Sequence, residues 1–212
     1  MKKTWAKYYE SYQPNKLNIL LHFHYLISII ILNPKSILEI GCGSAEHSMF
    51  IKKAFNRKKI SFLDNDKIIL KKAKKKYSKL VNSFYEADIL NKKMIQGIHH
   101  HDIAMSQGLM EHFNDDEFIK VIKNFRGKVK YFIFSIPSNY YPTIDFGNEI
   151  LRSKQEIKNI LSNIDRIDFS VKNYLDIGFK TKLIGAKKIN NPFLKILYFF
   201  KSNHLLIKIK YL

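Results

Sequence analysis

A Gly-x-Gly turn between a buried strand and a helix constrains this chain more than any other feature. The apolar run 37–40 contains one acidic residue, Glu39, and leads directly into Gly41-Cys42-Gly43. Glycine lets the backbone pass close to a ligand where a Cβ would collide. The turn also directs the N–H groups of the next helix at that ligand. We therefore predict a nucleotide-type cofactor site here.

Strand-like and helix-like patterns alternate after this turn. We predict further strands at 60–64, 81–85, 102–105 and 130–136, and helices at 46–56, from Asp66, from Asp115 or Asp116, and at 153–164. The strands are apolar on both faces, which is typical of a parallel sheet covered by helices on both sides. We also predict two later strands, at 167–174 and 180–186, which would form a closing hairpin at the edge of the sheet. The fold class is thus α/β, a Rossmann-like, doubly wound, mostly parallel sheet with an antiparallel C-terminal edge.

Two apolar segments lie outside this alternating core. Residues 17–32 approach the length of a membrane span, but their two histidines and an asparagine favour a buried helix that ends before Pro34. Residues 193–212 are basic and apolar, which suits an interfacial helix on anionic lipid or a helix packed on the domain or on a partner; we favour the packed helix. We divide the chain into an N-terminal helical cap (1–34), a cofactor-binding domain (35–190) and a basic apolar tail (191–212).

Composition limits the functional class. The chain has 212 residues and a net charge of +19. This charge suits nucleic acid, but lysine is abundant and arginine scarce, so a lysine-rich composition explains it better. The lysine run at 71–76 is expected to be the solvated face of a helix. The single cysteine, Cys42, excludes disulfides and cysteine-based zinc sites within the chain. We expect no signal peptide and a cytoplasmic location, with peripheral membrane contact through the tail as an alternative.

Three acidic residues fall at the ends of consecutive predicted strands: Glu39, Asp64 and Asp88. Strand ends of a parallel sheet meet in one crevice, where ligands bind. A carboxylate about 20 residues past a glycine turn suits a ribose diol, which makes Asp64 the ribose candidate. Asp88 is placed to meet an adenine amino group. Glu46 replaces the third glycine of a dinucleotide motif and would repel a pyrophosphate, so the ligand should carry little phosphate and some positive charge.

Four segments, in order, resemble motifs of the class I S-adenosylmethionine-dependent methyltransferases, particularly the small-molecule type. The first, Glu39-Ile40-Gly41-Cys42-Gly43-Ser44-Ala45, is similar to E-x-G-x-G-x-G with alanine at the third glycine. The second begins at Asp64-Asn65-Asp66, the third is Ala87-Asp88-Ile89, and the fourth runs from Asp102 to His112. The resemblance extends from about residue 37 to about residue 136.

The resemblance implies S-adenosylmethionine as the cofactor and gives the site residues their roles. Gly41, Cys42 and Gly43 form the turn that lines the methionine part, and Glu39 holds that turn or the amino group. Asp64 binds ribose, Asn65 lies near adenine, Asp88 meets the adenine amino group and Ile89 packs on the ring. Ser106 and Gln107 lie under the methionyl end. The implied activity is methyl transfer, for which the protein mostly supplies alignment.

The sequence constrains the methyl acceptor less than it constrains the cofactor. His112, beside Glu111, is the candidate general base, and a packed histidine at a helix start is the alternative. The histidines at 99–101 are interpreted as a polar loop, without a metal. No Asn/Asp-Pro-Pro-Tyr/Phe motif follows the fourth strand, which disfavours methylation of nucleic-acid bases. We expect a small or lipid-like metabolite as acceptor. An RNA methyltransferase using the basic surface, or a non-catalytic cofactor-binding module, remains the alternative.

Overall fold

A single mixed sheet forms the centre of the protein. The computed structural model describes residues 16–56, 58–142, 148–174, 190–193, 198 and 203–212. Seven strands in this part of the chain lie in the order β3-β2-β1-β4-β5-β7-β6. Their bounds are β1 Ser36–Ile40, β2 Lys59–Asp64, β3 Ser83–Glu86, β4 His101–Gln107, β5 Val129–Pro137, β6 Ile167–Tyr174 and β7 His204–Tyr211. Strands β1 to β5 pair in parallel, and β7 runs antiparallel to both of its neighbours. The predicted Rossmann-like fold class is confirmed.

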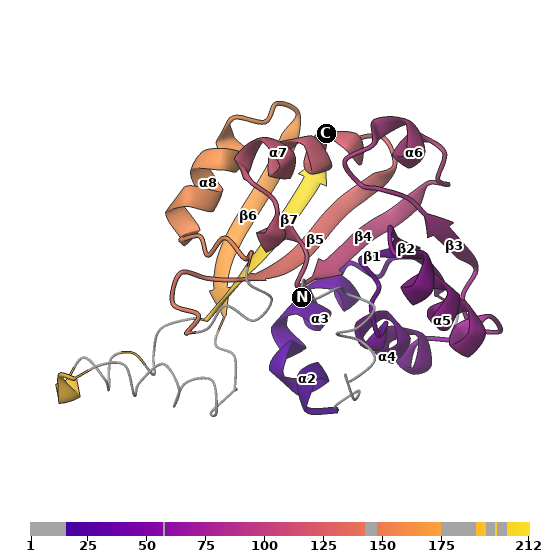
Figure 1. Ribbon diagram of the computed structural model, residues 1–212, viewed down its shortest axis with the longest axis horizontal. Helices are drawn as coiled ribbons and strands as arrows, with labels where there is room; N and C mark the ends of the chain where they lie inside the picture. Colours follow the sequence, from indigo (N-terminus) through magenta and orange to yellow (C-terminus); the bar gives the residue numbers. More distant parts are fainter. Residues whose placement is uncertain (1–15, 57, 143–147, 175–189, 194–197, 199–202) are drawn as a thin grey trace.

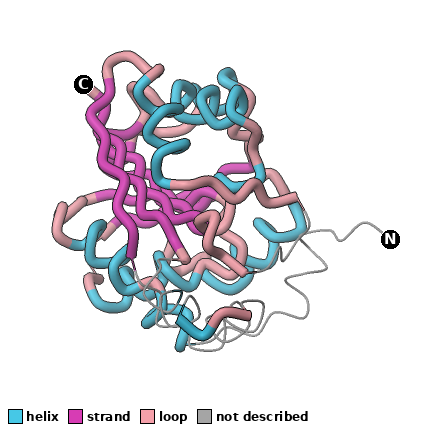
Figure 2. The backbone as a smooth tube through the Cα atoms, turned by 90° about the vertical axis from the view of Figure 1, so that its left-hand side faces the viewer, coloured by secondary structure: helices cyan, strands magenta, loops and turns pink. Residues whose placement is uncertain are grey.

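Helices cover both faces of the sheet. One side carries α2 (Lys16–Leu21), α3 (Phe23–Ile30), α4 (Glu46–Ala54) and α5 (Lys67–Tyr77), and the other carries α6 (Lys92–Gln96), α7 (Asp115–Asn124) and α8 (Lys154–Ser162). A 3₁₀ helix, η1 (Met110–His112), follows β4. Each face has its own apolar core, one around Tyr25 and Met49 and the other around Phe118 and Phe134. Figures 1 and 2 show the sheet between these two helical layers.

Helix α5 shows how local sequence determines an element beside the site. The Asp66 side chain caps it, accepting hydrogen bonds from the backbone N–H groups of Ile68 at 2.8 Å and Ile69 at 3.2 Å. Ile69, Leu70 and Ala73 are buried, whereas Ile68, in the first turn of the helix, is 55% exposed. The lysines at 71, 72 and 74–76 are exposed, so their interpretation as a solvated face is confirmed.

The N-terminal apolar stretch forms two short helices rather than the one predicted over 17–32. The break lies at His22, which has a non-helical conformation between α2 and α3. Tyr25, Leu26 and Ile29 are fully buried, as expected of a helix packed on the domain. Among the described residues, no helix is long and apolar enough to cross a membrane.

The C-terminal segment corrects a prediction. A helix was expected over 193–212, either interfacial or packed, but residues 204–211 form strand β7 between β5 and β6. The physical reason is a period of two: Leu205, Ile207 and Ile209 join the core under α7 and α8, while Lys208 and Lys210 alternate with them. The strand expected at 180–186 lies outside the described residues.

Candidate cofactor site

The turn after β1 needs residues that tolerate a left-handed backbone. Gly41, Gly43 and Ala45 have φ values of 62°, 47° and 57°. Gly41 N–H donates to the Leu63 carbonyl at 2.8 Å, which ties the turn to the end of β2. Glycine adopts this conformation at little cost, whereas Ala45 is strained by about 1 kcal/mol. The glycines therefore shape a turn that lies close to whatever fills the adjacent space.

A pocket of about 250 Å³ opens beside this turn at the carboxyl ends of β1 to β4. Six of the predicted cofactor residues line it. They are Gly41, Gly43, Asp64, Asn65, Asp88 and Ile89. The position is the one where open α/β sheets bind ligands, at the point where strand order reverses between β1 and β4. These residues lie far apart in the sequence, and the parallel pairing of the strands brings them together in the fold.

Asp64, the last residue of β2, joins the turn to the strand end. Its Oδ1 accepts a hydrogen bond from Asp66 N–H at 2.9 Å, and its Oδ2 accepts one from Gly43 N–H at 3.5 Å. The Cys42 thiol donates to the same Oδ2 at 3.8 Å. The carboxyl is 6% exposed, and this burial raises its pKa. Asp64 is thus a fixed acceptor on the pocket wall, suited to hydroxyl donors.

Asp88 and Ile89 follow β3 on the other side of the pocket. The Asp88 Oδ1 accepts a hydrogen bond from Leu90 N–H at 2.9 Å, which closes a tight turn around the strand end. Asn124 of α7 donates its side-chain N–H to the Ile89 carbonyl at 2.8 Å. Two helices of the second layer therefore fix this wall, because α6 begins directly after it at the cap residue Asn91.

Four predicted cofactor residues lie outside the pocket lining. Glu39 is buried and accepts a hydrogen bond from the Ser48 hydroxyl of α4. Its burial, with Glu46 and Asp64 nearby, raises the pKa of Glu39 to about 8. Cys42 is also buried. Ser106 and Gln107 belong to β4, where they pair with β5.

The turn between β4 and α7 holds the candidate base. The ring Nδ1 of His112 lies 2.8 Å from the Asn148 side-chain oxygen, and burial lowers the pKa of His112. His112 does not line the pocket, so its catalytic role stays a prediction. Its neighbour Glu111 is 4% exposed, and burial raises the pKa of this carboxyl to about 8.

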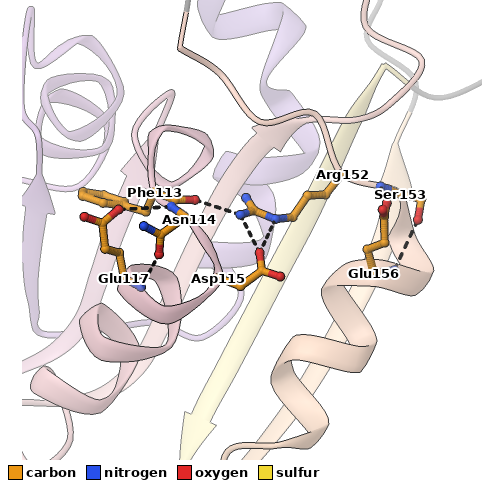
Figure 3. A network of polar contacts seen from close by, with 7 residues as sticks. All are labelled: Phe113, Asn114, Asp115, Glu117, Arg152, Ser153 and Glu156. Atoms are coloured by element: carbon orange, nitrogen blue, oxygen red, sulfur yellow. Dashed lines mark hydrogen bonds and ion pairs between the residues drawn. The ribbon is translucent and has the colours of Figure 1, made fainter.

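A buried arginine fixes the end of this turn (Figure 3). Arg152 donates through Nε and Nη2 to the Asp115 carboxylate, at 3.0 and 2.7 Å, and through Nη2 to the Phe113 carbonyl at 2.8 Å. Capping boxes start the helices on either side, Asn114 with Glu117 and Ser153 with Glu156. Because Phe113 lines the pocket, Arg152 positions part of the pocket wall from behind.

Most of the lining that the sequence did not reveal is apolar. It comprises Ile40, Leu63, Ile69, Ala87, Leu90, Leu109 and Phe113, with Gly108. Apolar side chains at strand ends have the same sequence signal whether they face a ligand or the core. Gly108 and Leu109 belong to the fourth motif, and nothing in the sequence distinguishes Phe113. The histidine run does not reach this pocket: His101 contacts Ser61 Oγ and the His99 carbonyl instead.

The comparisons with known proteins agree with this geometry. Residues 37–130 match the family model described as a methyltransferase domain. The methyltransferase domain of bacterial CtHen1-C superposes with a TM-score of 0.68 at 13% identity, covering 92% of this chain and 99% of that one. The plantazolicin methyltransferase BpumL, in complex with S-adenosylhomocysteine, gives 0.63 at 14% identity, covering 100% and 95%. No curated protein sequence matches significantly.

A third solved structure is the magnesium protoporphyrin IX methyltransferase ChlM of Synechocystis PCC 6803 with bound S-adenosylmethionine, with a TM-score of 0.59 at 13% identity, covering 97% and 89%. At such identities the likeness shows the fold. Together with the matched methyltransferase domain, it confirms the resemblance seen in the sequence. Over residues 37–130 the chain therefore matches a methyltransferase domain, in the fold of S-adenosylmethionine-dependent methyltransferases, and S-adenosylmethionine is its cofactor.

Proposed function

We propose that this methyltransferase transfers a methyl group to an oxygen, nitrogen or carbon atom of a small or lipid-like metabolite. The observation that carries the proposal is the pocket in which Gly41, Asp64 and Asp88 meet. Two relatives support a compact acceptor by name: ChlM acts on magnesium protoporphyrin IX, and BpumL was crystallised with desmethyl-plantazolicin analogues. The cytoplasm is the compartment that we propose, since the single cysteine is a buried free thiol.

The residues of the pocket suit an adenosyl group. We assign the ribose hydroxyls to Asp64, the adenine amino group to Asp88, and the faces of the ring to Ile89 and neighbouring apolar side chains. Asn65 would lie at the adenine edge. The methionyl end would extend over Gly41 and Gly43, where the missing side chains leave space, toward Ser106 and Gln107. Glu39, buried behind the turn, is the residue that we assign to hold the turn or the amino group of this end.

The chemistry demands little of the protein beyond alignment. When bound, the cofactor supplies a methyl group already activated on a sulfonium. The turn between β4 and α7 would orient the acceptor, and an acidic acceptor proton would need a nearby base, for which His112 is the candidate. The fixed turn and the Arg152 network hold these groups in place before any ligand arrives.

Calorimetric titration of the purified chain with S-adenosylhomocysteine tests the cofactor site. We expect binding in the micromolar range with one site per chain. The acceptor is tested by incubating the protein with labelled S-adenosylmethionine and fractionated cell extract, and identifying the labelled product. A labelled small molecule supports the proposal. Binding without turnover on any fraction would instead identify a non-catalytic module, and no binding at all would overturn the assignment of the pocket.

One observation favours a second candidate, an RNA acceptor. Lysines crowd the exposed face of α5 at 71, 72 and 74–76, next to an exposed Ile68. A single-stranded RNA could follow such a surface electrostatically. RNA binding that weakens steeply with salt, together with label in the RNA fraction, would favour this candidate over the metabolite.

A further inference from the structure

Glu111 carries a buried carboxyl oxygen that has no partner among the described residues. Glu111 lies in η1, between β4 and α7. The residue is 4% exposed, and its Oε2 has no hydrogen-bond partner in the described part of the chain. Among the ion pairs found there, none includes Glu111. A buried carboxyl oxygen without a partner costs free energy, so a fold that keeps one at a ligand site invites a ligand group as the missing partner.

This carboxylate lies against the wall of the cofactor pocket. A Cβ built on Gly108, which lines the pocket, would be 3.7 Å from Glu111 Oε1. The backbone of Glu111 is fixed from the other side, because Ile150 N–H donates to its carbonyl at 2.7 Å. Glu111 is therefore held in η1, which directly follows β4, the strand that contains Ser106 and Gln107.

The charge around Glu111 is negative, against the trend of the whole protein. Glu149 lies close enough for its charge to raise the pKa of Glu111 further, after burial. The chain as a whole carries +19. Once Glu111 is ionised, near pH 8, such a site would favour a cationic group over phosphate or carboxylate.

We propose that Glu111 marks the acceptor subsite and that the acceptor is an amine. This inference rests on the proposed function, since it places the amine next to the methyl group of the cofactor. The nitrogen lone pair forms the new bond to the methyl carbon, and the carbon–sulfur bond breaks with its electrons going to sulfur. The proton of the amine goes to Glu111 in its ionised form, which is present at pH 8, and from there to solvent. The products are the methylated amine and neutral S-adenosylhomocysteine.

The cofactor analogue sinefungin tests the placement, because it carries an amine where the cofactor carries its methyl group. Calorimetry at pH 8 should show that the wild type binds sinefungin about tenfold more tightly than S-adenosylhomocysteine, the effect of one charge-assisted hydrogen bond. Glu111→Gln should bind S-adenosylhomocysteine as the wild type does, which also shows that it is folded, and should lose the preference for sinefungin. Glu117→Gln keeps the capping box of α7 and is the matched control, which should retain the preference.

The outcomes separate this inference from the proposed function. No binding of either compound to the wild type contradicts the cofactor pocket itself. Equal binding of both by the wild type, or a preference that survives in Glu111→Gln, overturns only the role of Glu111. If S-adenosylmethionine shows the same Glu111-dependent preference as sinefungin, the carboxylate serves the sulfonium charge and the amine acceptor is wrong. Labelled product from cell extract should be an N-methylated amine, and an O- or C-methylated product contradicts the inference.

Discussion

The side chain of Leu109 lies over Gly41: a Cβ built on Gly41 would be 3.0 Å from Leu109 Cδ2. The two residues come from the ends of neighbouring parallel strands, β1 and β4, and both line the pocket. The glycine turn and the turn after β4 are therefore in contact across the pocket floor. A Cβ at Gly41 would require the end of the Leu109 side chain to shift by a few tenths of an ångström.

Gly41→Ala tests this contact. The new methyl group would meet Leu109, and alanine at a φ of 62° is strained by about 1 kcal/mol. We expect a modest loss of stability in chemical denaturation and a loss of S-adenosylhomocysteine affinity of at least about tenfold, because the added atom occupies the space of the ligand. Gly127→Ala is the control for strain alone, since Gly127 has a φ of 75° and nothing within 4 Å of its Cβ position. Equal affinity in both variants would contradict the close approach at Gly41.

Asp64→Ala should abolish cofactor binding. The carboxylate is the proposed acceptor for two ribose hydroxyls, and each hydrogen bond to a charged group contributes about 1.5–3 kcal/mol. Titration with S-adenosylhomocysteine should show a loss of at least about a hundredfold. Glu86→Gln removes an exposed charge at the end of the next strand and should leave the affinity unchanged. Retained binding in Asp64→Ala would mean that the ribose lies elsewhere.

Stability should fall as the pH rises from 6.5 to 8, partly because of Glu39. Burial raises the pKa of Glu39 from 4.5 to about 8, so the folded state holds a proton that the unfolded state has already lost. The contribution is complete below pH 4.5 and is lost as the pH approaches 8. Between pH 6.5 and 8 the contribution of Glu39 to the free energy of unfolding falls by at most about 2 kcal/mol. Urea denaturation of Glu39→Gln should show a flatter pH profile than the wild type, and parallel profiles would refute the buried neutral carboxyl.

Histidine 47 has the opposite effect in acid. Burial lowers the pKa of His47 from 6.5 to about 4, so the unfolded state takes up a proton first when the pH falls. Stability from His47 is present above pH 6.5 and is lost toward pH 4, by about 1.4 kcal/mol per pH unit. Wild type and His47→Gln should therefore differ most in the change of their unfolding free energy between pH 6.5 and 5. Identical changes in both proteins would show that this imidazole is protonated in the fold.

Arg152→Lys should weaken the fold and the pocket together. Lysine lacks the Nε–H that donates to Asp115, and its shorter side chain would have to replace Nη2 in the contacts with Asp115 and the Phe113 carbonyl. We expect a loss of about 2 kcal/mol in chemical denaturation and weaker cofactor binding, because Phe113 lines the pocket. Arg126→Lys alters the more exposed pair with Asp165 and should cost less than about 1 kcal/mol. Unchanged binding in Arg152→Lys would show that Phe113 is positioned by other contacts.

The sequence revealed the cofactor turn because few residues can form it. Left-handed positions require glycine, and strand-end carboxylates fall at regular spacing, so Gly41, Asp64 and Asp88 carry a signal of their own. Parallel pairing then brings them together without further information. The parallel pairing of the first five strands is predicted by the same alternation of strands and helices.

Other features depend on contacts between distant residues, which a single sequence does not specify. The segment 204–211 has enough apolar residues for a helix. Its period of two is short, and the pairing with β5 on one side and β6 on the other completes the case for a strand. Leu109 and Phe113 look like ordinary core residues until the pocket is seen. The missing partner of Glu111 cannot be recognised before the whole neighbourhood of its carboxyl is known.

The position of β7 also determines an order of assembly. Strand β6 is made about thirty residues before β7, yet among the described strands it pairs with the sheet only through β7. During synthesis, β1 to β5 can pair as they emerge, while β6 remains an unpaired edge until residues 204–211 leave the ribosome. Slow or interrupted translation over this interval would therefore expose β6 to pairing with other chains.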